Sequence, residues 1–269
     1  MRKLLLVLFV LLGSSSLFSQ ISLLEKEQQI KSEFDGLVLA DTDSLKLSIC
    51  NKIEKLFSDL LVEEQSFDYP FSELSKMGKL TSPDQKFRIF NWNCVLSDGS
   101  YRYFGLLQIK LKKSIYVENL TDSELAGDMF HQYKPANWPG ALYYQIIPFK
   151  TKSGSSYFLL GWDGNDFRTN KKLIEVLSFD ENGQATFGIP VILWKGKILN
   201  RIVFEYAKQA GMTIQYHEKE KRIVFDHLAP SSPNYQNQFE YYGPDFSYDA
   251  LEYQKGKWVL VENVDVRNK

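Results

Sequence analysis

The fold class is decided by residues 86–111, KFRIFNWNCVLSDGSYRYFGLLQIKL. Apolar and polar residues mostly alternate over 86–93, and a second aromatic run returns over 101–111. Between the two runs, Ser97-Asp98-Gly99 supplies residues that are typical of a tight turn. Short runs rich in aromatic and β-branched residues are typical of strands. The stretch therefore predicts an antiparallel β-hairpin.

The same pattern continues to the end of the chain, and Asn182-Gly183 adds a further strong turn signal. Short runs with no helix-length segment between them predict a mainly β fold, an antiparallel meander. A sandwich, a barrel and a propeller-like arrangement are all compatible with this pattern. The further strands are expected at 141–149, 156–162, 172–179, 185–187, 190–194, 198–206, 212–217, 222–227, 248–253 and 258–266.

Before this β region, residues 43–64 have the spacing of an amphipathic helix. Apolar residues such as Leu45, Ile49, Ile53 and Leu60 recur mostly at three- and four-residue intervals, and Asp41, Thr42 and Asp43 offer N-cap side chains. A short segment from Ser72 to Lys79 could add a helical turn. We therefore expect a signal peptide at 1–20, an N-terminal helical extension at 21–82 and an antiparallel β domain at 83–269.

The first twenty residues predict export. Arg2 and Lys3 precede an unbroken apolar run, Leu4 to Leu12, and small and polar residues follow to Gln20. This order is typical of a secretory signal peptide, and the run is shorter than the roughly 20 residues of a membrane-spanning helix. We expect a mature chain without a transmembrane segment.

The nearly balanced charge gives no reason to expect nucleic-acid binding. The chain has 32 Lys and Arg against 33 Asp and Glu, so losing Arg2 and Lys3 gives 30 − 33 = −3 for the mature chain. No basic field is present to attract nucleic acid.

Cys50 and Cys94 are the two cysteines of the chain. In an oxidising exported compartment they can form one disulfide between the helix and the first strand of the hairpin. Two buried free thiols are the alternative, and both possibilities stay open at this point.

The loop Gly161-Trp162-Asp163-Gly164-Asn165-Asp166 gathers two carboxylates and an amide after an apolar strand. These are calcium-type ligands, but Phe167 and Arg168 break the EF-hand order. A plain turn explains the loop better, and we expect no metal and no cofactor.

Enzyme signatures are mostly missing. His217-Glu218-Lys219-Glu220-Lys221 lacks the second histidine of the zinc-protease motif, and the mature chain has no G-x-S-x-G, P-loop or G-x-G-x-x-G motif. Asp226 and His227 are neighbours on an expected strand, so their side chains point to opposite faces. A carboxylate-dependent hydrolase would instead need Asp163 or Asp166 to face Asp226, Asp245 or Asp249 across a cleft.

Residues 228–248 form a proline-bearing connection with many aromatic side chains, which suit recognition of sugars, peptides or proteins. The alternative is that this connection folds back over one end of the β domain. If it meets the 162–166 loop at one rim, the two would form a binding surface. Its candidate residues are Trp162, Asp163, Asp166, Tyr241, Tyr242 and Asp245.

Three segments, YFLLGWDGND (157–166), RIVFDHLAP (222–230) and YYGPDFSYDAL (241–251), together with a leader ending in Ser-Gln, resemble uncharacterised exported β-rich proteins of Bacteroidetes-type Gram-negative bacteria. The resemblance implies export and no particular chemistry. The sequence ends at Asn268-Lys269 just after an expected strand, so we expect no C-terminal sorting domain. We therefore expect a periplasmic or outer-membrane-associated address rather than an extracellular one.

These observations favour an exported binding or envelope-associated module whose partner is an envelope glycan, peptide or protein. A hydrolase of glycans or peptides is the first alternative. A scaffold or assembly component that docks a partner on its amphipathic helix is the second.

Overall fold

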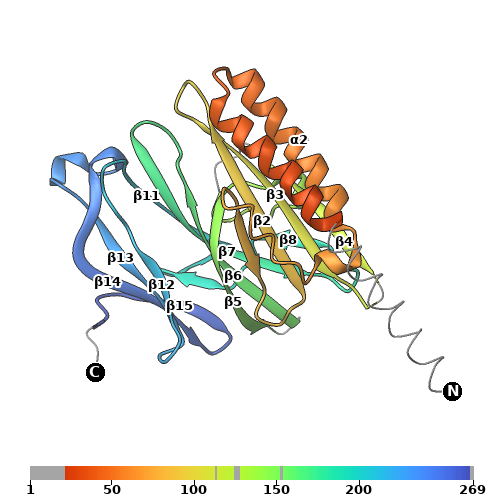
Figure 1. Ribbon diagram of the computed structural model, residues 1–269. Helices are drawn as coiled ribbons and strands as arrows, with labels where there is room; N and C mark the ends of the chain where they lie inside the picture. The colour runs from red at the N-terminus through yellow and green to blue at the C-terminus, as the bar shows by residue number, and fades with distance from the viewer. Residues whose placement is uncertain (1–21, 113, 124–127, 152–153, 267–269) are drawn as a thin grey trace.

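The computed structural model describes residues 22–112, 114–123, 128–151 and 154–266. The expected signal peptide, 1–20, lies outside the described residues. Figure 1 shows a layered molecule, with a helical layer on one side and β-sheets stacked behind it. The fold is mainly β, and its sheets do not close into a barrel, so the sequence-based fold class is confirmed.

The helical layer contains a helix over residues 22–39 and the helix α2 (Asp43–Leu61), which is followed by the short helix η1 (Glu64–Ser66). Thr42 is the N-cap of α2, and its hydroxyl accepts a hydrogen bond from the Leu45 N–H at 3.3 Å. This confirms the helix expected from residue 43. Among the described residues, no helix is long and apolar enough to cross a membrane.

The helices cover the first sheet, which we call the helix-covered sheet. Its strands follow chain order, β1 (Gly78–Thr81), β2 (Phe87–Val95), β3 (Tyr101–Lys110) and β4 (Ile115–Thr121). The expected hairpin is present, with Val95 opposite Tyr101. Residues 72–77 form turns that lead into β1, so the helical turn suggested at 72–79 was wrong.

Both faces of the helix-covered sheet are buried. Phe90 and Trp92 of β2 face the helices, where α2 contributes Ile53, Phe57 and Leu60. Phe87 and Ile89 alternate with them and face the next sheet. Because α2 packs its apolar side onto its own chain, that side is already occupied.

Arg88 fixes the connection between α2 and β1. The side chain is buried, and its Nη1 donates hydrogen bonds to the carbonyl oxygens of Ser66, Phe67 and Tyr69 at 2.9–3.0 Å. The guanidinium also lies 4.6 Å from the centroid of the Phe90 ring. Burial lowers the pKa of Arg88 to about 10. The charge is therefore held by carbonyl dipoles and an aromatic face rather than by water.

The second sheet, the central sheet, contains β5 (Leu142–Thr151), β6 (Gly154–Asp163), β7 (Thr169–Phe179) and β11 (Ile202–Ala207) in the order β11-β7-β6-β5, and β8 (Ala185–Phe187) pairs with β7. Tyr157 and Leu159 of β6 face the helix-covered sheet, whereas Phe158 and Leu160 face the third sheet. Water therefore reaches neither face of the middle of this sheet.

The third sheet, the C-terminal sheet, has the order β10-β9-β15-β14-β13-β12. Its strands are β9 (Ile192–Trp194), β10 (Lys197–Leu199), β12 (Ile214–His217), β13 (Arg222–Pro230), β14 (Tyr242–Gln254) and β15 (Lys257–Val261). Its pairs are antiparallel except for β15 with β9, which is parallel. The single strand expected at 198–206 divides into two strands that lie in different sheets.

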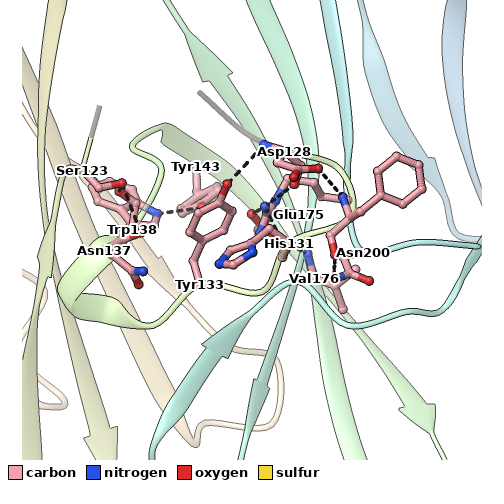
Figure 2. A network of polar contacts seen from close by, with 12 residues as sticks. Ser123, Asp128, His131, Tyr133, Asn137, Trp138, Tyr143, Glu175, Val176 and Asn200 are labelled. Atoms are coloured by element: carbon pink, nitrogen blue, oxygen red, sulfur yellow. Dashed lines mark hydrogen bonds and ion pairs between the residues drawn. The ribbon is translucent and has the colours of Figure 1, made fainter. Parts of the chain in front are cut away.

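A buried ion pair lies inside this stack. Arg201 Nε is 2.7 Å from Glu175 Oε2, and both side chains have no exposed surface. Arg201 Nη1 donates to the carbonyl oxygens of Asp128 and His131, at 2.9 and 3.2 Å, and the guanidinium lies over the Tyr133 ring. Figure 2 shows Glu175 beside Asp128, His131 and Tyr133. The pair joins β7 to the segment 128–133.

The next aromatic residues continue this polar network. Trp138 Nε1 donates to the Tyr143 hydroxyl at 2.9 Å, and the Asp128 N–H donates to the Tyr133 hydroxyl (Figure 2). Burial raises the pKa of Glu175, against the opposing attraction of Arg201. The network is sealed from solvent at the ion pair, so we assign it to structure rather than to binding.

We expect Phe57→Ala to lower the free energy of unfolding by about 3–5 kcal/mol, because it leaves a cavity between α2 and the helix-covered sheet. Leu45→Ala is the matched control in the same helix, since Leu45 is 46% exposed. Urea unfolding followed by circular dichroism measures both. An equal effect of the two substitutions would show that α2 is not docked on the sheet.

Glu175→Gln should lower the free energy of unfolding by about 3–5 kcal/mol, because it leaves the Arg201 charge buried without a counterion. The double variant Glu175→Leu/Arg201→Met should recover much of this loss, since both charges are gone. Denaturant unfolding at neutral pH tests both. A single-variant loss below about 1 kcal/mol would indicate that water reaches the pair.

Candidate functional site

A polar pocket of about 210 Å³ opens where the start of β3 meets the 163–171 region of the central sheet. It brings together residues that are far apart in the sequence. Aromatic, amide and charged side chains share its wall. The lining residues are Ser100, Tyr101, Arg102, Tyr103, Asp122, Pro139, Asp163, Asn165 and Lys171.

Tyr103 connects several residues of the pocket by hydrogen bonds. Its hydroxyl donates to Asp163 Oδ1 at 2.7 Å and accepts from the Gly164 N–H at 2.8 Å. Its backbone N–H donates to Asp122 Oδ2 at 2.9 Å. Burial raises the pKa of Tyr103, and the neighbouring Asp163 charge raises it further. The phenol is therefore a fixed donor that positions the Asp163 carboxylate.

The Trp162–Asp166 loop needs glycine at position 164. A Cβ atom there would lie 2.2 Å from the Tyr101 ring, which is too close for any side chain. Tyr101 also meets Trp162 edge-to-face, with ring centroids 5.6 Å apart. Trp162 thus supports the aromatic side of the pocket.

Two lysines complete the pocket region. Lys171 Nζ donates to Asn165 Oδ1 at 2.6 Å. Lys208 Nζ donates to the Gly164 carbonyl at 2.8 Å and lies 5.0 Å from the Tyr101 ring centroid. Positive charge therefore lies close to the aromatic wall and to the Asp163 carboxylate. Such a surface can bind a small ligand that carries both acceptor and donor groups.

Asp166 has a different role. Its Oδ1 accepts hydrogen bonds from the Arg168 and Thr169 N–H groups at 2.7 and 2.9 Å. Burial opposes ionisation, but these backbone hydrogen bonds and nearby lysines hold the pKa of Asp166 below its ordinary value. Asp166 therefore stabilises the turn, as the interpretation of this loop as a plain turn predicts.

The aromatic connection is shorter than expected, because β13 continues to Pro230 and β14 begins at Tyr242 rather than at 248. The short helices η3 (Pro233–Tyr235) and η4 (Phe239–Tyr241) fill the rest. Arg168 and Glu240 lie 3.3 Å apart in an ion pair, so this connection does touch the 162–168 loop.

The two candidate tyrosines differ in exposure. Tyr241 is half-exposed and stacks on Tyr235, with ring centroids 4.0 Å apart. Tyr242 is only 9% exposed, and its hydroxyl accepts a hydrogen bond from the Asn237 N–H. Tyr242 therefore packs inside the connection and does not present its ring to a ligand.

Asp245 lies elsewhere, in a bulge of β14. Leu228 pairs with Pro244 and Asp226 with Tyr248, so residues 245–247 lie opposite His227 alone. Asp245 Oδ1 accepts hydrogen bonds from the Ser247 N–H and hydroxyl. None of the interactions found among the described residues joins Asp245 to the 162–168 loop.

The same bulge reveals a histidine–carboxylate pair that the sequence did not indicate. His227 Nδ1 lies 2.7 Å from Asp249 Oδ2, and the Asn263 N–H donates to Asp249 Oδ1. Asp226 instead accepts from the Thr213 N–H and hydroxyl. The expectation that Asp226 and His227 do not pair is confirmed. The bulge sets the strand register that brings His227 to Asp249. The sequence carries no signal for that register.

The described residues include no group of three or more His, Cys, Asp and Glu side chains that could hold a metal ion. Comparison with known proteins adds no assignment to this geometry. No protein-family model matches the chain, no curated protein matches it, and no solved structure matches it.

Tyr103→Phe should lower the free energy of unfolding by about 1–3 kcal/mol, because the buried Gly164 N–H and the Asp163 carboxylate both lose a partner. Tyr101→Phe is the control on the same strand, where a half-buried ring loses its hydroxyl. Thermal unfolding compares the two. A loss for Tyr101→Phe as large as that for Tyr103→Phe would contradict the special role of Tyr103.

Proposed function

We propose that this protein is an exported binding module and that the pocket at Tyr101, Asp163 and Lys171 takes a small polar unit of an envelope glycan. The observation that carries the proposal is the convergence of aromatic, carboxylate, amide and ammonium groups from two sheets in one opening. Export is inferred from the leader sequence.

The chemistry of the wall favours a sugar. Sugar rings present hydroxyl groups around their edge and C–H groups on their faces. Asp163 and Asn165 offer oxygen acceptors, Lys171 offers N–H donors, and the Tyr101 ring offers an apolar face. The volume of about 210 Å³ lies below the roughly 300–1,000 Å³ of pockets for drug-sized ligands, so a single terminal unit fits better than a chain.

Binding is favoured over hydrolysis by the way the carboxylates are held. Asp163 and Asp122 both accept hydrogen bonds from Tyr103, one from its hydroxyl and one from its backbone N–H. A retaining or inverting glycosidase needs one acid and one base or nucleophile on opposite sides of the scissile bond. Carboxylates fixed around one tyrosine are better suited to orienting ligand hydroxyls.

The test is a screen of soluble hexoses, N-acetylhexosamines and peptidoglycan fragments by saturation-transfer NMR, followed by calorimetry on the sugars that bind. Lys171→Met should weaken binding of such a sugar at least tenfold, about 1.4 kcal/mol. Loss of the Lys171 donor and of its hold on Asn165 is the reason.

Lys172→Met is the matched control. Lys172 is the next residue on β7, and its ammonium lies 4.3 Å from the Tyr144 ring rather than in the pocket. We expect its affinity to stay within about twofold of the parent, since adjacent strand residues face opposite sides. The proposal fails if no sugar in the set binds, or if both lysine variants bind as the parent does.

A further inference from the structure

Cys50 of α2 and Cys94 of β2 meet in the apolar core between the helices and the helix-covered sheet. Both are free thiols, Cys50 fully buried and Cys94 5% exposed. Their side chains hydrogen-bond to each other. The two thiols thus lie together at the helix–sheet interface, although they are 44 positions apart in the sequence.

One of the two thiols lies at a surface groove. A groove of about 280 Å³ runs between the helix at 22–39 and the end of β2, and Cys94 is part of its wall beside Phe34, Leu37, Val38 and Val95. Cys50 does not line the groove and is fully buried. A reagent that enters the groove therefore meets Cys94 first.

Charged side chains also lie beside Cys94. The hydrogen bond from Cys50 lowers the pKa of Cys94 and burial opposes this. The nearby charges of Lys46 and Arg102 lower the pKa further, and that of Asp43 raises it. Arg102 is the cross-strand partner of Cys94, and Lys46 Nζ donates to the carbonyl of Val95, the next residue. The same hydrogen bond and burial raise the pKa of Cys50. Thiolates are the nucleophiles in disulfide exchange.

We propose that Cys94 and Cys50 are an oxidation site that closes one disulfide between α2 and β2, with Cys94 reacting first from the groove and Cys50 completing the bond. The oxidant is a disulfide, either a small molecule or a dithiol-disulfide protein. This inference does not depend on the sugar pocket.

The exchange balances in two steps. The Cys94 thiolate attacks one sulfur of the external disulfide, whose S–S bond breaks to release one thiol and leave a mixed disulfide on Cys94. Cys50 then loses its proton and attacks the Cys94 sulfur, releasing the second thiol. The protein loses two protons and two electrons, and the external disulfide takes them up to become two thiols.

The experiment incubates the reduced full chain with oxidised glutathione under native conditions and follows intact mass. The parent protein should lose the mass of two hydrogen atoms and retain no glutathione. Cys50→Ala should retain one glutathione on Cys94. Cys94→Ala should leave Cys50 unmodified until denaturant is added.

Thermal unfolding of the parent protein with and without reductant needs no variant. The oxidised form should melt about 5–15 °C higher, because the crosslink restricts the unfolded chain. Two free thiols persisting at redox equilibrium would overturn the disulfide. Modification of Cys94→Ala as fast as that of Cys50→Ala would overturn the order of attack through the groove.

Discussion

The central sheet has an apolar layer against each face, and the rest of the architecture follows from this constraint. Its strands send alternate side chains into two cores, as Tyr157 and Phe158 show on β6. A sheet of this kind needs cover on both sides, and the helix-covered sheet and the C-terminal sheet supply it (Figure 1). The helices then cover the outer face of the first of these sheets. The layers therefore share cores and cannot be separated without exposing apolar surface.

Local signals in the sequence were sufficient for much of the fold. The N-cap at Thr42 and the turn between Val95 and Tyr101 depend on neighbouring residues, and both were predictable. β1 and β4 were missed because they lie at the edges of their sheet, where partial exposure weakens the alternation. The run at 198–206 was wrongly taken as one strand because Arg201 turns inward to Glu175, and that partner lies 26 residues away.

The candidate site was less predictable for the same reason. Asp163 could be found because it follows an apolar strand and precedes a glycine. Lys171 is its cross-strand neighbour on β7, but Tyr103 joins it only because two sheets approach each other, and no local pattern encodes that approach. Asp249 is similar, since its pairing with His227 depends on the bulge at 245–247. Single candidate residues can be predicted from the sequence. The residues that join them in a site are determined by tertiary packing.

The buried pair of Glu175 and Arg201 also limits how this sequence can evolve. A substitution at either position leaves the opposite charge buried without a counterion. A lineage that changes one residue therefore passes through a less stable intermediate. Replacement must occur at both positions close together in time, or after stabilising changes elsewhere. Homologous chains should therefore keep both residues or lose both, and this joint inheritance would identify distant members of the same lineage when overall similarity has faded.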